Sequence, residues 1–162
     1  MPMELGLRVN VVEDLDRFIL HHQVMEKTTD DQVTVAMVDE IKQRCSTLRA
    51  ISMDKGFHSP ANQQALKKRL ECVVLPKKGC RSQADQARES ELEFIRLRKE
   101  HSAVESAINA LEYHGLDKCP DHGIDGFKRY IALAVVARNI QRLGAVLRQQ
   151  EQEKEPSVSS IS

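Results

Sequence analysis

The sequence lacks the features that mark several classes of protein. Its four cysteines, Cys45, Cys72, Cys80 and Cys119, lie far apart and form no C-x-x-C pair, so reduced thiols are expected. Cys119 and His122 lie close together, but no second close pair of ligands exists, which disfavours zinc. No stretch approaches the apolar length that spans a bilayer, and no signal segment opens the chain. These absences favour a cytoplasmic protein without membrane contact.

The formal net charge is zero, but the charges are unevenly distributed along the 162 residues. Residues 1–66 carry 7 basic against 10 acidic side chains, and the last fourteen residues carry 1 against 3. Residues 67–148 carry 16 against 11, a net charge of +5. A basic second half is compatible with a polyanionic partner, although solvated helix faces produce the same imbalance.

Hydrophobic periodicity predicts an α/β chain whose second half is largely helical. Strands are expected at residues 4–12, 18–25, 48–53 and 72–75, and helices at residues 31–44, 60–70 and 124–150, with only helix from Ser82 onward. The centre of the long helix, residues 130–137, is apolar nearly all round and is expected to be buried. Residues 1–150 are predicted to form one domain, and residues 151–162 a disordered polar tail.

The stretch from Ser52 to Pro60 joins a strand to a helix. An apolar run ends at Asp54, Gly56 permits a tight turn, and Ser59 and Pro60 suit the N-cap and first turn of the next helix. Asp54 is therefore expected at the carboxyl end of a strand, where ligands bind in open α/β sheets. The alternative is that Asp54 is only a turn residue.

Glu105 also has two possible roles. Ser102 and Glu105 fit a capping box, which would explain the carboxylate structurally. On helical spacing, however, His101, Glu105, Asn109 and Glu112 share one polar face, which could be an inward-facing polar site.

Several basic side chains could contact phosphates, although solubilising charge is equally consistent with them. One cluster precedes the fourth expected strand, another follows it, and the long helix carries a basic stripe. These candidates are Lys67, Lys68, Arg69, Lys77, Lys78, Arg81, Arg138, Arg142 and Arg148.

A resemblance to a known family rests on short segments that occur in a characteristic order. They include FILHHQVMEKTTDD, SMDKGFHSPAN, VVLPKKG, HSAVESAINALE and HGLDKCPDHG, and the match covers about residues 4 to 148. In these segments the chain resembles the C-terminal part of a DDE-type insertion-sequence transposase with an RNase H-like catalytic domain. The closest group is the one filed as not classified yet, ISNCY.

The resemblance implies a site for DNA cleavage and strand transfer. In this family the second acidic residue ends the strand after the first helix, which is Asp54 here, and the third lies on a late helix, which is Glu105. Both would be catalytic metal ligands, because hard carboxylate oxygens suit two Mg²⁺ or Mn²⁺ ions. The resemblance further implies DNA, at insertion-sequence ends, as the partner, with His101 among the DNA contacts, and a homo-oligomer when complete.

The chain departs from the family's pattern at the first acidic position. The element order begins with what resembles the second strand of the fold, and no Asp precedes Asp14. We therefore expect a truncated RNase H-like mixed sheet, a hairpin plus two further strands, that is inactive alone. The family's Y-x2-R-x3-E-x6-K signature is also incomplete, with Arg98, His101 and Glu112 where Tyr, Arg and Lys would stand.

Two other functions are consistent with the sequence. One is a non-enzymatic helical remnant that dimerises or binds DNA. The other is an unrelated Mg²⁺-dependent nuclease that adds a further carboxylate, such as Asp14, to Asp54 and Glu105.

Overall fold

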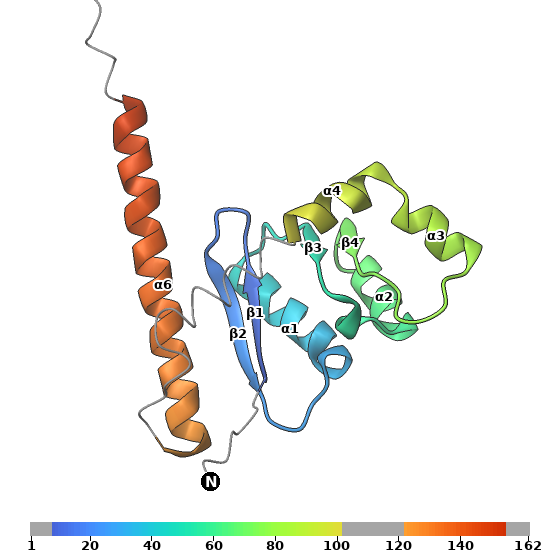
Figure 1. Cartoon of the computed structure of the whole chain (residues 1–162), viewed down its shortest axis with the longest axis horizontal. Helices are drawn as coiled ribbons and strands as arrows, with labels where there is room; N and C mark the ends of the chain where they lie inside the picture. Colours follow the sequence, from blue (N-terminus) through green and yellow to red (C-terminus); the bar gives the residue numbers. More distant parts are fainter. Residues whose placement is uncertain (1–7, 102–121, 155–162) are drawn as a thin grey trace, which may run out of the picture. The chain divides into compact units, whose positions relative to one another are not determined.

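The structure, a computed structural model, describes residues 8–101 and 122–154 (Figure 1). Within these ranges the chain divides into two compact units. The first unit comprises residues 8–12 and 20–101, and the second comprises residues 13–19 and 122–154. The assignment of residues 1–150 to one domain stays a prediction.

The described elements follow the expected order of strands and helices. They are β1 Arg8–Glu13, β2 Ile19–Met25, α1 Asp30–Arg44, β3 Ala50–Ser52, the 3-10 turn η1 Lys55–Phe57, α2 Pro60–Lys67, β4 Cys72–Val74, α3 Gln83–Glu89, α4 Leu92–His101 and α6 Gly123–Lys154. The mixed α/β class and the largely helical second half are confirmed.

The four described strands form two pairs. β1 pairs with β2, and β3 pairs with β4 in parallel, with Ile51 opposite Val73. The ladder continues past β3, because the Met53 N–H donates to the Val74 carbonyl oxygen at 2.9 Å. Since β3 and β4 run in the same direction, the residues that follow both strands lie at one edge of the pair.

Helix α1 begins where the short polar residues predicted it. The Thr29 N–H donates to Oε1 of Gln32 at 3.0 Å, which satisfies one backbone donor ahead of the helix. Asp30 and Asp31 occupy the first turn, where carboxylates oppose the positive end of the helix dipole.

Helix α2 also begins as predicted but ends earlier. Ser59 Oγ accepts the Asn62 N–H at 3.1 Å, and Pro60 opens the first turn. The helix ends at Lys67 rather than at Leu70, because the Arg69 and Leu70 N–H groups both turn back to the Leu66 carbonyl oxygen. This turn directs the chain into β4.

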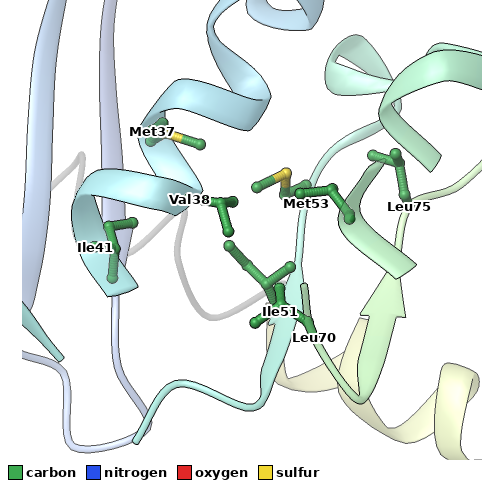
Figure 2. Packing of buried hydrophobic residues seen from close by; sticks show 8 residues of the cluster. Met37, Val38, Ile41, Ile51, Met53, Leu70 and Leu75 are labelled. Carbon is green, nitrogen blue, oxygen red and sulfur yellow. The ribbon is translucent and has the colours of Figure 1, made fainter. Parts of the chain in front are cut away.

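One hydrophobic cluster holds the first unit together (Figure 2). Helix α1 contributes three side chains to it, and the β3 and β4 segments and α2 contribute the rest. Its buried members are Met37, Val38, Ile41, Ile51, Met53, Leu66, Leu70 and Leu75. Val12 and Leu20 of the hairpin also pack against the cluster, so the same core supports both strand pairs.

In the second unit, α6 packs against the tip of the β1–β2 hairpin. The Asn139 side chain makes two hydrogen bonds to the backbone of Ile19. Its Nδ2 donates to the Ile19 carbonyl oxygen at 3.0 Å, and its Oδ1 accepts the Ile19 N–H at 2.8 Å. Arg142 donates from Nε to the Asp16 carbonyl oxygen. These hydrogen bonds join positions more than 100 residues apart in sequence.

Two predictions about the long helix were wrong. Residues 130–137 are not buried all round, because Ile131, Ala134 and Val135 are buried while Leu133 and Val136 are exposed. The helix also continues into the predicted disordered tail, as far as Lys154. A hydrogen bond from Gln149 Nε2 to Glu153 Oε1 at 3.1 Å, four residues apart, supports this last turn.

Among the described residues, one helix, α6, has the length and the apolar composition that a membrane-spanning helix needs. This differs from the sequence-based expectation that no stretch has that character. A single such helix is weak evidence, and Arg138 and Arg142 lie within its apolar stretch.

Candidate functional site

Asp54 lies just beyond the carboxyl end of β3, as predicted. Met53 still belongs to the ladder with Val74, and Asp54 then caps the 3-10 turn η1, its Oδ1 accepting the Lys55 N–H at 2.9 Å. The Asp54 side chain is exposed to solvent. The turn role and the ligand role are therefore compatible, because the cap uses only one carboxylate oxygen.

The turn after Asp54 is anchored on two helices. Asn62 of α2 donates from Nδ2 to the carbonyl oxygens of Asp31, at 2.7 Å, and Phe57, at 3.0 Å. Thr34 of α1 donates from Oγ1 to the Asp30 carbonyl oxygen at 2.7 Å and lies 3.4 Å from that of Phe57. Both side chains are buried, so the position of the turn, and with it that of Asp54, is set by packed groups.

Sequence reasoning missed Asn62 and Thr34 as supports of this turn. Only the helix starts around them could have been read from the sequence, since Ser59 and Pro60 precede Asn62 and Thr29 precedes Thr34. Their bonding partners lie 4 to 31 residues away, and nothing in the local pattern identifies the distant ones.

The loop after β4 leaves the same edge of the parallel pair and carries charges of both signs. Lys77 Nζ lies 2.6 Å from Asp85 Oδ2, and the Lys77 N–H donates to Glu89 Oε1 at 2.8 Å. Arg81 Nε lies 3.2 Å from Glu89 Oε2. Hydrogen bonds from Lys77 and then Ser82 hold the pKa of Asp85 well below its usual range.

The predicted DNA-contacting residues of the first unit fall into two groups. One group, Arg69, Lys77 and Arg81, forms ion pairs with carboxylates of the same chain. The pair of Arg69 with Asp39 is bidentate, with Nε 2.7 Å from Oδ1 and Nη2 3.2 Å from Oδ2. Lys67, Lys68 and Lys78 are exposed and form none of the ion pairs found among the described residues. Lys78 is the exposed cation closest in sequence to the end of β4.

Two basic residues of α6, Arg138 and Arg142, lie beside the hairpin tip in the second unit. Arg142 is hydrogen-bonded to Asp16, as described above. Arg138 lies near Glu13, whose pKa is raised by burial, an effect that the positive charge of Arg138 opposes. Arg148 is exposed.

The remaining predicted positions are Glu105, His101 and Asp14. Glu105 lies outside the described residues, and His101 lies at the end of α4, with its side chain also outside the description. Asp14, the alternative third carboxylate, is used in the hairpin turn, where its Oδ1 accepts the Phe18 N–H at 2.8 Å. Among residues 8–101 and 122–154, no three His, Cys, Asp or Glu side chains gather as a metal site.

The chain matches a protein-family model described as Transposase DDE domain over residues 5–140, which is most of its length. No curated protein and no solved structure matches it. The matched range includes Asp54 and the segment that carries Glu105.

Proposed function

The chain belongs to the transposase DDE domain family, and on that premise we propose that Asp54 is the second acidic ligand of a site that cleaves and joins DNA. The observation that carries the proposal is the exposed carboxylate of Asp54, held just beyond β3 at the carboxyl edge of a parallel strand pair.

Glu105 is proposed as the third acidic residue of the same site, as the resemblance implies. Hard carboxylate oxygens suit Mg²⁺ or Mn²⁺, and Asp54 offers one, because its cap to Lys55 uses Oδ1 alone. Two such ions, when bound, would activate the attacking hydroxyl and stabilise the leaving oxygen. What Asp54 itself contributes is a fixed negative charge on a turn that two buried side chains anchor.

An RNase H-like core is part of the proposal. In the core that the resemblance implies, a further strand carries the first aspartate and lies between the hairpin and the parallel pair. Without that strand, the other strands of such a core would form two separate pairs. The described strands do form two pairs, and one hydrophobic cluster supports both of them. For the 162 residues by themselves we therefore expect DNA cleavage near background, since only two of the three acidic positions are matched.

DNA is the proposed partner, in the cytoplasm, and the complete enzyme is proposed to act as a homo-oligomer. The exposed lysines Lys67, Lys68 and Lys78 support sequence-independent contact with phosphates. Lys78 is the favoured contact, because the loop that carries it leaves the same strand edge as Asp54.

Metal binding tests the assignment of Asp54 without requiring activity. Backbone amide signals of Lys55 and its neighbours should broaden when Mn²⁺ is added to the parent chain, and they should not broaden in Asp54→Asn. The asparagine keeps an oxygen for the η1 cap, so this variant should fold. Asp14→Asn is the matched control and should behave as the parent does; equal broadening in the parent and Asp54→Asn would refute the proposal.

A second assay addresses catalysis. Purified chain should nick supercoiled plasmid no faster than background in Mg²⁺ or Mn²⁺. Metal-dependent nicking that disappears in both Asp54→Ala and Glu105→Ala would contradict the expected inactivity. Loss of that nicking in Asp14→Ala as well would support the nuclease that uses Asp14.

A further inference from the structure

The loop that follows β4 is tied to α3 by two ion pairs. Lys77 Nζ lies 2.6 Å from Asp85 Oδ2, and Arg81 Nε lies 3.2 Å from Glu89 Oε2. We call these four residues the α3 clasp. Both cations were predicted to contact phosphate, yet each faces a carboxylate of its own chain. The α3 clasp therefore occupies two of the positive charges that a polyanion would otherwise meet on this loop.

The two pairs of the α3 clasp differ in how firmly they are made. Lys77 follows the buried Pro76, and besides the pair of its Nζ with Asp85 its backbone N–H donates to Glu89 Oε1 at 2.8 Å. Arg81 has a side chain that is 47% exposed, and Glu89 Oε2 accepts no hydrogen bond from the residues that the structure describes. An exposed ion pair of this kind changes an equilibrium by about fivefold at most. Arg81 is thus the cation that is released most easily.

The release of Arg81 does not leave Glu89 as an unpaired buried charge. The Glu89 side chain is only 6% exposed, so it needs another partner when Arg81 leaves. The Lys77 N–H already donates to Oε1, and Arg88 Nη2 lies 3.7 Å from that oxygen. Nε and Nη2 of Arg88 are buried and form no hydrogen bond with the described residues, so they are available to Glu89. One cation replaces another at the carboxylate.

The loop also has room for Arg81 to turn towards solvent. Residues 78–82 are all exposed. Gly79 adopts a φ of +86°, and a Cβ atom added there would meet nothing within 4 Å. Arg81 can therefore leave Glu89 without displacing a packed side chain, and it lies in the same exposed segment as Lys78.

We propose that the α3 clasp is an autoinhibitory contact, in which Glu89 keeps Arg81 from binding phosphate until a polyanion displaces the carboxylate. Phosphate oxygens suit the planar guanidinium group as carboxylate oxygens do, and a polyanion presents several of them to one loosely held cation. The inference rests on the proposed function for the source of the phosphate, which is DNA. Lys78 makes the first contact, and Arg81 adds a second once Arg88 has taken its place at Glu89.

Glu89→Gln tests the α3 clasp through DNA affinity, measured by fluorescence anisotropy on the full chain. Glutamine keeps an oxygen for the Lys77 N–H but removes the charge that attracts Arg81, so affinity should rise about threefold or more. Glu91→Gln makes the same change of charge two residues along, at an exposed position, and should alter affinity by less than about 1.5-fold because salt screens that charge. Equal gains in the two variants would overturn the proposal.

A double-mutant cycle separates release of Arg81 from a general change of charge. Arg81→Ala should reduce DNA affinity at least about threefold more in the Glu89→Gln background than in the parent, because only in that background is Arg81 free of its carboxylate. Equal losses in both backgrounds would show that Glu89 does not restrain Arg81.

Nuclear magnetic resonance of the ¹⁵N-labelled parent follows the exchange without any substitution. The side-chain Nε–H signals of Arg81 and Arg88 should both shift when duplex DNA is added, and inorganic tripolyphosphate should shift them as well. Shifts with tripolyphosphate alone would support the α3 clasp and remove DNA as its partner. Backbone shifts at Lys78 with DNA, while Arg81 stays unchanged, would overturn the α3 clasp and leave the proposed function standing. An Arg81 signal that responds to neither polyanion would also overturn it.

Discussion

A Cβ atom added to Gly56 would lie 2.9 Å from Oδ2 of Asp30, so the turn after Asp54 and the first turn of α1 pack with no room for a methyl group. Asp30 is itself ion-paired, with its Oδ2 3.5 Å from Arg8 Nη1. The turn that positions the candidate ligand is thus fitted against the acidic start of α1.

This contact predicts the effect of Gly56→Ala. The added methyl must displace the Asp30 carboxylate, which is a flexible group, so the free energy of unfolding should fall by only ~0.5–1 kcal/mol. Urea unfolding measures the change. In a double-mutant cycle, Asp30→Ala should remove the penalty of Gly56→Ala, and a penalty that persists unchanged would locate the clash elsewhere.

Asn62→Ala should be more damaging than Gly56→Ala. The substitution removes both hydrogen bonds to the carbonyl oxygens of Asp31 and Phe57 at a buried position, which should cost ~2 kcal/mol of unfolding free energy. Gln64→Ala, at an exposed position of the same helix, is the control and should change stability by less than ~0.5 kcal/mol. Similar losses in both variants would show that Asn62 does not anchor the turn.

Lys78→Ala should weaken DNA binding without affecting the fold. Lys78 is exposed, so its removal should lower affinity for any DNA sequence and reduce the slope of log affinity against log salt by ~1. Fluorescence anisotropy at several salt concentrations provides the measurement. Lys27→Ala, another exposed lysine outside the predicted contacts, should bind as the parent does, and an unchanged slope in Lys78→Ala would exclude the contact.

Stability should depend on pH through His21 of β2. Burial lowers the pKa of His21 below 6.5, and the nearby Glu40 carboxylate, 3.6 Å from Nδ1, only partly opposes this. The unfolded chain therefore binds the proton more readily, so the free energy of unfolding should fall as pH decreases through 6.5 towards the lowered pKa. The pKa of His22 is lowered in the same direction, by burial and then by Arg44.

Urea unfolding between pH 7.5 and 5.5 tests this dependence. Stability should decline over that interval in the parent and decline less in His21→Gln. His22→Gln is the comparison for the neighbouring group. A parent chain whose stability rises on acidification would reverse the predicted sign.

The local order of the chain followed from the sequence alone. Alternating apolar residues identified the hairpin, and short polar residues identified the starts of α1 at Thr29 and of α2 at Ser59. The position of Asp54 at a strand end followed from the same patterns, because periodicity and capping depend on neighbours within a few residues. Even the resemblance to DDE transposases rested on short segments in a fixed order, and the family match bears it out.

Only the tertiary structure decided which groups are engaged and which are exposed. Arg69 and Lys78 both belong to basic clusters in the sequence. The structure distinguishes them, because Arg69 is hydrogen-bonded to Asp39, 30 residues away, while Lys78 is exposed. The apolar centre of α6 predicted burial, yet the hairpin tip covers one side of that helix, and Leu133 on the other side is exposed. Periodicity shows which residues share a face, but what covers that face comes from distant parts of the chain.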